Sequence, residues 1–121
     1  MPEIIKNEIY KGLNYRIHKN SAPHYGIAKL GQKTKYGELM WYTAYIAIPK
    51  NHPILIDLNN IDVYGGITWD ENKFPDSDKM TNYRVIGWDY CHGYELEKSI
   101  TLEDVLEDVY KTIRLINSVR K

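Results

Sequence analysis

The fold is decided by the stretch LMWYTAYIAI, residues Leu39 to Ile48. It carries no charge and is rich in aromatic and β-branched side chains, which favour strands. Nearly continuous apolarity of this length is typical of a central strand that is covered on both faces. Pro49 ends the strand, and Lys50 to Pro53 indicates a turn, because the residue before a proline avoids the helical conformation.

The sequence before this strand has weaker patterns. Residues 1–12 are either a loose arm or an edge strand, and Leu13 to Lys19 alternates enough for a half-buried strand. We expect a turn over Asn20 to Pro23, then a short strand from His24 to Leu30. Gly31 to Gly37 is polar and basic, which indicates an exposed loop.

Two further strands are expected after the central one. Ile54 to Asn60 is ambiguous and is compatible with one irregular helical turn. Asp62 to Trp69 and Tyr83 to Tyr90 are predicted strands, and Asp70 to Asn82 between them is a long polar loop. A polar loop of that length inside a compact domain is usually functional or mobile.

The end of the chain predicts a helix within residues 101–119. Thr101 and Asp104 form a capping-box pattern, and acids precede bases along the segment, which complements the helix dipole. The predicted length is about 17 residues, or roughly 25 Å. Apolar residues recur at helical spacing, namely Leu102, Val105, Leu106, Val109, Ile113 and Ile116.

Together these elements predict one α+β domain over residues 1–121, with an antiparallel sheet of about five strands across residues 13–98. One long C-terminal helix packs on that sheet. A single helix leaves the other face of Leu39 to Ile48 uncovered, so we expect a homo-oligomer in which a second protomer covers it.

Composition narrows the possible functions. Hydrophobic content of 43% and charged content of 26% are ordinary for a globular protein. A formal net charge of zero argues against binding to duplex nucleic acid or to a membrane surface. The single cysteine, Cys91, excludes an internal disulfide. No segment approaches the roughly 20 apolar residues of a membrane-spanning helix, and the acidic N-terminus is unlike a secretory signal, so we expect a cytoplasmic protein.

Two glycine-broken segments hold the candidate functional residues. Val63 to Trp69 and Tyr83 to Tyr94 place glycines beside Trp, Tyr, Asp, Arg and His. Glycine in an extended segment lets a ligand approach the backbone closely. Alternation in the second segment puts Val85, Gly87 and Asp89 on one face and Ile86 with Trp88 on the other. The pattern predicts a small-molecule pocket.

Catalytic and metal chemistry are poorly supported. Cys91 and His92 are neighbours, and neighbours on a strand point to opposite faces, so they do not form a nucleophile–base pair. The histidines lack metal-ligand spacing, and Asp89 with His92 is the nearest approach to it. We therefore expect a binding protein, with no catalytic residue, no metal and no cofactor.

Stacking and phosphate binding remain as the expected chemistry. Trp and Tyr rings offer about 1–3 kcal/mol per stacked base, and arginines bind phosphate oxygens bidentately. Asp89 is a candidate acceptor for ribose hydroxyls, and His92 a candidate donor to a phosphate or a base edge. A core position for Trp88 and a solvated position for Arg114 stay open as alternatives. The candidate ligand-binding residues are Arg16, Gly65, Gly66, Trp69, Tyr83, Arg84, Trp88, Asp89, His92 and Arg114.

The segments Val63 to Thr68 and Gly87 to His92 resemble the phage anti-Thoeris family. Its members act as sponges for the cyclic ADP-ribose signal made by bacterial TIR-domain immune proteins. The resemblance implies binding of glycocyclic ADP-ribose without cleavage, in recesses of a homodimer, in the cytoplasm of the infected bacterial host. Some members are hexamers and also bind cyclic oligonucleotides.

Within these segments the residues that match the family are Gly65, Gly66, Trp88, Asp89 and His92. Tyr64, Trp88 and Cys91 stand where the family tends to have His, Phe and Asn, which leaves the base selectivity open. Two alternatives to a sponge also remain open. One is a nucleotide-hydrolysing enzyme with Asp89 and His92 as acid and base. The other is a protein-binding inhibitor of a host defence factor that uses the acidic loop from Asp70 to Asn82.

Overall fold

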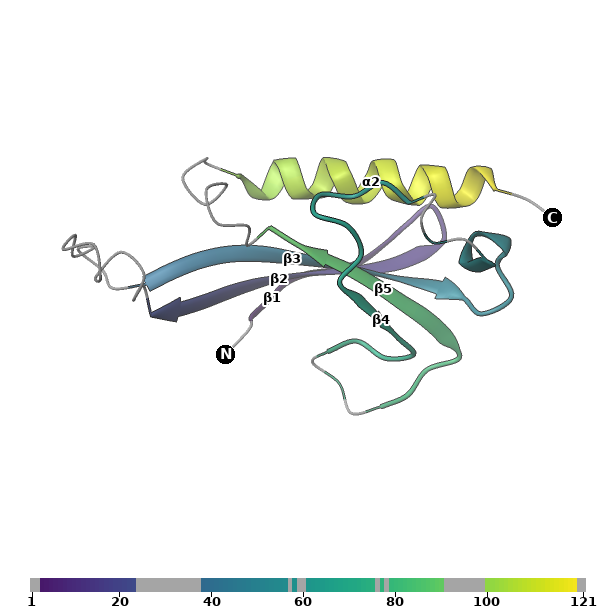
Figure 1. Ribbon diagram of the computed structural model, residues 1–121, viewed down its shortest axis with the longest axis horizontal. Helices are drawn as coiled ribbons and strands as arrows, with labels where there is room; N and C mark the ends of the chain where they lie inside the picture. The colour runs from purple at the N-terminus through teal and green to yellow at the C-terminus, as the bar shows by residue number, and fades with distance from the viewer. Residues whose placement is uncertain are drawn as a thin grey trace.

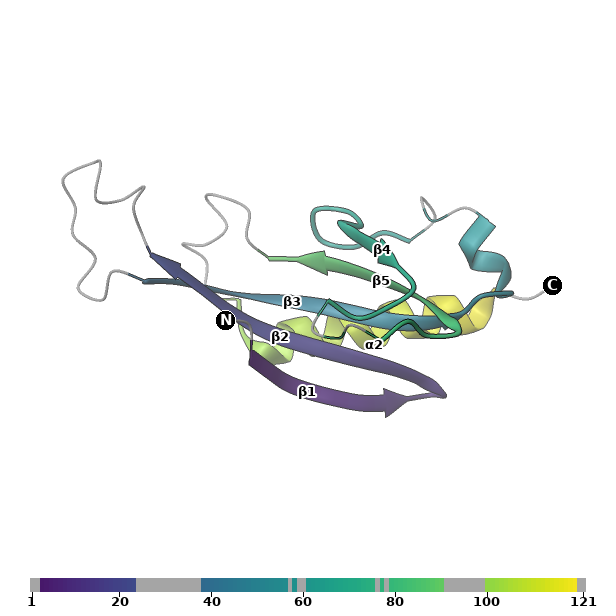
Figure 2. The same cartoon turned by 90° about the horizontal axis from the view of Figure 1, so that it is seen from below.

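The structure is a computed structural model that describes residues 3–23, 38–56, 58, 61–75, 77, 79–90 and 100–119. Five strands form one sheet in the order β1-β2-β3-β5-β4, with every neighbouring pair antiparallel. Figure 2 shows β1 and β4 at its two edges. The predicted α+β architecture is confirmed. The elements are β1 (Glu3–Tyr10), β2 (Leu13–Pro23), β3 (Glu38–Pro49), η1 (Pro53–Ile56), β4 (Trp69–Glu71), β5 (Tyr83–Asp89) and α2 (Leu102–Ser118).

The helix α2 lies along one face of the sheet, which we call the helix face (Figure 1). The main core lies between these two layers, because β2, β3 and β5 each direct alternate apolar side chains toward the helix. Residues that are fully or almost fully buried there include Tyr15, Ile17, Ile46, Ile86 and Trp88 from the sheet and Val105, Val109, Ile113 and Ile116 from α2.

The opposite face of the sheet, which we call the distal face, has a smaller core of its own. Tyr45, Ala47 and Val85 are buried together with Phe74, and Trp69 packs against them. Phe74 belongs to the segment between β4 and β5, which lies on the side of the sheet away from α2 (Figure 1). The chain thus covers part of this face of β3 itself. A second protomer is therefore not required to cover this part of the face, and the homo-oligomer stays a prediction.

The start of α2 has the predicted capping box. Thr101 Oγ1 accepts a hydrogen bond from the Asp104 amide at 3.1 Å, and the Asp104 carboxylate accepts one from the Thr101 amide at 2.9 Å. These contacts satisfy donors that the first helical turn leaves without partners. The helix has 17 residues, as predicted.

Two predicted elements are wrong. The turn expected over Asn20 to Pro23 is strand, because these residues continue the pairing of β2 with β3 from Asn20–Trp41 to Pro23–Glu38. The strand expected over Asp62 to Trp69 is mostly irregular chain with a turn at Tyr64 and Gly65, and β4 begins only at Trp69. Gly65 and Gly66 have φ values of 72° and 82°, a region that suits glycine, and the Gly66 amide donates to the Val63 carbonyl at 2.9 Å.

The remaining expectations have mixed outcomes. The edge-strand alternative for residues 1–12 is confirmed by β1, and the irregular helical turn after Pro53 by η1. The long loop begins at Asn72 rather than Asp70, because β4 extends to Glu71. The strand expected over His24 to Leu30 and the loop from Gly31 to Gly37 lie outside the described residues. In the part of the chain that the structure describes, no helix is long and apolar enough to cross a membrane.

Candidate functional site

The two segments that carry the family resemblance lie side by side at the C-terminal end of β5. The Thr68 amide donates to the Gly87 carbonyl at 2.8 Å, and Thr68 Oγ1 donates to Asp89 Oδ2 at 3.3 Å. We call Gly65, Gly66, Thr68 and Asp89 the motif junction. Gly65 and Thr68 are exposed, and Gly66 and Asp89 are half-buried. Thr68 and Asp89, from two separate segments, are therefore joined near the surface, and Gly65 and Gly66 precede Thr68 in its segment.

A chain of buried contacts anchors the motif junction to the helix. The Tyr64 ring stacks on the Tyr90 ring with centroids 5.1 Å apart. The Tyr90 hydroxyl accepts from Trp88 Nε1 at 3.0 Å and donates to Asp108 Oδ2 on α2 at 2.7 Å. Burial, together with the Asp108 carboxylate, raises the pKa of the Tyr90 hydroxyl well above its usual value, so the hydroxyl stays protonated and can donate.

Trp88 is a core residue in this structure. Its side chain is 1% exposed, and its indole N–H is satisfied by Tyr90. The ring was a candidate for stacking on a ligand, but it belongs to the main core between the sheet and α2. The core alternative is what the structure shows.

Gly87 also has a packing role. A Cβ built on Gly87 would lie 2.4 Å from Cδ1 of Tyr45 and 2.9 Å from the Ala44 carbonyl oxygen. The Tyr45 ring occupies the space that a side chain would need. Packing of the Tyr45 ring on the distal face therefore explains why this position is glycine, and no ligand is needed for the explanation.

A row of polar residues crosses three strands of the distal face next to Asp89. Register places Thr43 opposite both His18 on β2 and Asp89 on β5. His18 is 1% exposed, with its ring centroid 4.9 Å from that of Tyr45, and Thr43 accepts a hydrogen bond from Asn20. His18 and Thr43 were not among the ligand-binding residues predicted from the sequence. The β2–β3 register places His18 opposite Thr43, and the β3–β5 register places Thr43 opposite Asp89.

A cavity of about 410 Å³ opens at the other end of β5, on the distal face. We call it the distal cleft; its lining includes Ile9, Asn14, Arg16, Phe74, Lys79 and Tyr83. Arg16 and Tyr83 were predicted from the sequence, whereas Phe74 and Lys79 were not. Both missed residues belong to the segment between β4 and β5, whose path over the sheet has no local sequence signal.

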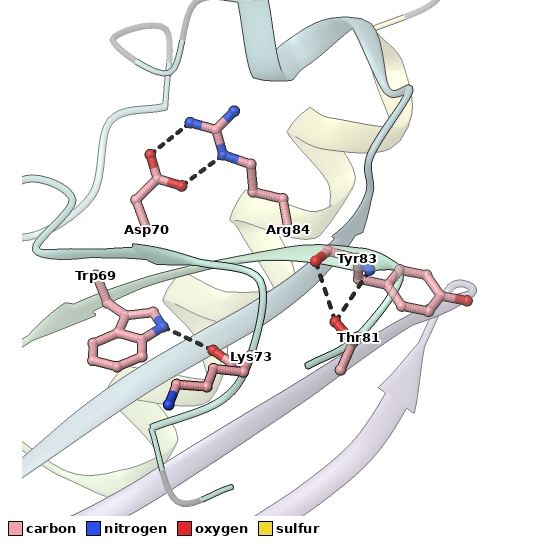
Figure 3. Close-up of polar contacts among 6 residues, drawn as sticks. All are labelled: Trp69, Asp70, Lys73, Thr81, Tyr83 and Arg84. Carbon is pink, nitrogen blue, oxygen red and sulfur yellow. Dashed lines mark hydrogen bonds and ion pairs between the residues drawn. The ribbon is translucent and has the colours of Figure 1, made fainter. Parts of the chain in front are cut away.

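Trp69 and Arg84 have structural partners on opposite sides of the β4–β5 pair (Figure 3). The Trp69 ring packs edge-on against Tyr45 with centroids 6.2 Å apart, and its Nε1 donates to the Lys73 carbonyl at 3.0 Å. Arg84 makes two hydrogen bonds to Asp70 at 2.6 and 2.7 Å. The bidentate pairing with Arg84 lowers the pKa of Asp70 below its usual range.

The last two candidates are separate from these groups. Arg114 is exposed on α2 and donates from Nη1 to the Tyr10 hydroxyl at 3.1 Å. His92 lies outside the described residues.

The predicted residues that the structure describes therefore do not form one pocket in a single protomer. Tyr83 and Asp89 are at opposite ends of β5, six residue steps or about 20 Å apart. Asp89 contacts Thr68, which follows Gly65 and Gly66 in the chain, and Arg16 and Tyr83 both line the distal cleft. Trp69, Arg84, Trp88 and Arg114 are held by the intramolecular contacts described above.

Comparison with known proteins identified no relative, so the function has to be inferred from the sequence and the structure of this protein. No protein-family model matches this chain, and no curated protein and no solved structure matches it. Among the residues that the structure describes, no group of three or more His, Cys, Asp or Glu side chains is placed to hold a metal ion.

Proposed function

We propose that this protein binds and sequesters a cyclic ADP-ribose-type immune signal without degrading it, as the phage anti-Thoeris sponges do. In the cytoplasm of an infected bacterium this would block TIR-based immunity. The observation that supports the proposal is the motif junction. Thr68 and Asp89 are 21 positions apart, yet a hydrogen bond joins the two segments from which the resemblance was drawn.

The chemistry of the motif junction suits a sugar-containing ligand. The turn at Gly65 and Gly66 has no side chains, so a ligand can approach its backbone closely. Asp89 is half-buried beside the hydroxyl of Thr68. A carboxylate in that position can accept hydrogen bonds from hydroxyl groups, which ribose carries.

Nucleotide hydrolysis with Asp89 and His92 as acid and base stays the alternative, since His92 lies outside the described residues, and His18 does not take the place of His92 beside Asp89. Within the described residues, the histidine on the same row of the sheet as Asp89 is His18, two strands away. Two strand spacings are about 10 Å, too far for an acid–base pair to share one proton.

We further propose that the working form is a homodimer or a higher homo-oligomer. One protomer presents the motif junction at the surface rather than in an enclosed pocket, since Gly65 and Thr68 are exposed. A second protomer would supply the missing walls and exclude water from the ligand. Light scattering with and without ligand measures the oligomeric state, and a monomer that retains ligand would contradict this part of the proposal.

The test of sequestration is a retention experiment. The protein is incubated with cyclic ADP-ribose isomers, freed of unbound ligand and heat-denatured, and the supernatant is analysed by mass spectrometry. We expect intact ligand that appears only after denaturation. No retained ligand would refute the proposal, and time-dependent conversion of the ligand would establish an enzyme instead.

A variant pair identifies the site. Asp89→Asn removes the negative charge at the motif junction and is expected to weaken retention by about 10–100-fold, the effect of losing a charged hydrogen-bond acceptor. Asp62→Asn is the matched control, since Asp62 is exposed and lies outside the junction. Equal retention by both variants would remove the junction from the site.

A further inference from the structure

The strand β1 is an edge of the sheet with an open outer side. It pairs with β2 from Glu3 to Tyr10, and no strand of the described residues pairs with its other side (Figure 2). An edge strand presents a row of unpaired amide and carbonyl groups, to which another strand can add. The eight residues of β1 include no proline, so the strand can pair over its length.

Two backbone positions of β1 point to this open side. The Tyr10–Leu13 pair closes the two-residue turn between β1 and β2. In an antiparallel ladder the backbone groups alternate between the two sides of a strand, counted from the hydrogen-bonded pair at the turn. The amide and carbonyl groups of Asn7 and Ile9 are therefore directed away from β2 and toward a partner.

Two apolar side chains are exposed on the distal face of β1. Ile4 is 45% exposed and Ile9 is 73% exposed. Register places Ile4 opposite His18, whose ring packs against Tyr45 on the distal face, and Ile9 lines the distal cleft on the same face. Burial of these side chains against a partner strand is favourable, because it removes apolar surface from water.

Two opposite charges lie on the helix face of β1. Lys6 is paired with Ile17 and Glu8 with Tyr15, and both partners belong to the main core. Lys6 Nζ lies 3.1 Å from Glu8 Oε2, and the two side chains are 35% and 55% exposed. Each copy of β1 therefore carries one positive and one negative charge side by side along its edge.

Antiparallel self-pairing with Asn7 on a two-fold axis brings these charges together. Asn7 then lies opposite Asn7 of a second copy, with the backbone groups of both directed at each other. Lys6 of each copy lies opposite Glu8 of the other, so four charges of alternating sign meet across the contact. A two-fold axis at Lys6 or at Glu8 would place like charges opposite each other. The charges therefore select one register.

The same register brings the exposed apolar side chains together. The strand β1 has one extra residue, Ile5, where its register against β2 shifts between Ile4 and Lys6. With this bulge counted, Ile4 of one copy lies opposite Ile9 of the other, and both are on the distal face. Each such pair of β-branched side chains adds packing to the contact. The bulge therefore fits at either end of the paired segment.

We infer that β1 is a homodimerisation surface, which joins two copies of this chain edge to edge into one ten-stranded sheet. The two-fold axis is perpendicular to the sheet, so the helices α2 of both copies lie on the same side. The motif junction lies toward the opposite edge of the sheet, because Thr68 directly precedes β4. The β1 contact therefore goes beyond the proposed function: it leaves the motif junction uncovered and requires no ligand.

Charge reversal tests the register by light scattering over a dilution series. Lys6→Glu or Glu8→Lys alone makes two attractive contacts repulsive, which should raise the dissociation constant about tenfold. The double variant Lys6→Glu/Glu8→Lys restores opposite charges and should associate like the unaltered protein. Both side chains are partly exposed at an edge, so the variants retain the fold, which circular dichroism checks.

Three results of this titration would overturn the inference. One is an unaltered protein that stays monomeric at every concentration. Another is normal association of both single variants, which would place the contact between copies on a different surface. The third is a double variant that associates no better than the single variants, since the charges would then not face each other in the register described.

Cysteine cross-linking tests the position of the two-fold axis. Asn7→Cys in a Cys91→Ser background places two Cα atoms about 5.5 Å apart, within the range of a disulfide. Glu8→Cys is the matched control, because its Cα atoms would be about 8 Å apart, beyond that range. We expect a covalent dimer on non-reducing gels with Asn7→Cys alone. Equal cross-linking of both variants, or of neither, would overturn the register.

The motif-junction variant separates this contact from the proposed function. Neither measurement uses a ligand, so a failed retention experiment does not affect their outcome. Asp89→Asn combined with Asn7→Cys should cross-link as efficiently as Asn7→Cys alone. Loss of cross-linking in the combined variant would refute the independence of the β1 contact from the motif junction.

Discussion

Replacing Tyr90 with phenylalanine tests whether the residues around Trp88 stabilise the fold or bind a ligand. The change removes one oxygen from a ring that is 3% exposed and leaves the rest of the side chain in place. That oxygen connects Trp88 Nε1, at 3.0 Å, with Asp108 on α2, at 2.7 Å. In Tyr90→Phe both contacts are lost together.

The expected cost follows from these two hydrogen bonds. The neutral bond from Trp88 contributes about 0.5–1.5 kcal/mol, and the bond to the Asp108 carboxylate about 1.5–3 kcal/mol. The indole of Trp88 is 1% exposed, so water does not replace its lost partner. We expect the free energy of unfolding to fall by about 2–4 kcal/mol, a large share of the 5–15 kcal/mol typical of a domain.

Urea denaturation followed by tryptophan fluorescence measures this loss. With a slope of about 2 kcal/mol per molar urea, the midpoint should fall by about 1–2 M while the slope stays constant. Tyr83→Phe is the control, because Tyr83 is exposed, and it should change stability by less than about 0.5 kcal/mol.

A loss below about 1 kcal/mol in Tyr90→Phe would show that the contact between β5 and α2 does not stabilise the fold as described. Asp108→Asn provides an independent check. Because both changes disrupt the same hydrogen bond, their effects should be non-additive in the double variant. Fully additive effects would contradict the link between Tyr90 and Asp108.

Three further predictions concern stability and use the same denaturation assay. Gly87→Ala should cost about 1–3 kcal/mol, because the added Cβ would lie 2.4 Å from the Tyr45 ring, and an unchanged midpoint would show that the ring moves away freely. Asp70→Asn should cost about 0.2–1 kcal/mol near neutral pH. Arg84 lowers the pKa of Asp70 in the folded state, so this stabilisation is present above the unfolded-state pKa and is lost as pH falls through the folded-state pKa. The two proteins should therefore converge in acid, and a constant difference would contradict the assignment. Thr101→Ala should cost about 1 kcal/mol and Thr101→Ser close to none, and equal losses would argue against side-chain capping.

The elements predicted correctly are those with strong local signals. The segment from Leu39 to Ile48 reads as a central strand, and the capping box with its apolar spacing predicts α2. The errors arose where long-range pairing or backbone conformation decided the structure. Asn20 to Pro23 contains turn-forming residues, yet β3 is long enough to pair with all of them. Gly65 and Gly66 look like part of an apolar strand, but they adopt positive φ.

The candidate site was only partly predicted, again because the folded packing decides which side chains come together. Alternation along β5 separated Asp89 from Trp88 correctly, but it does not reveal which face meets the helix. The burial of Trp88 was therefore undetermined. Arg16 and Tyr83 were selected by residue type, and they do share a cavity. Lys79 and Phe74 were missed because only the folded path of their segment places them against the sheet.

The segment that connects β4 and β5 limits how the distal cleft can evolve. Shortening it would remove Phe74 and uncover Tyr45 and Val85. The exposed apolar patch would then favour association between copies of the protein. The lining of the distal cleft is therefore more readily changed by substitution than by deletion. Lys79 is an exposed lining position where substitution leaves the packing of Phe74 intact.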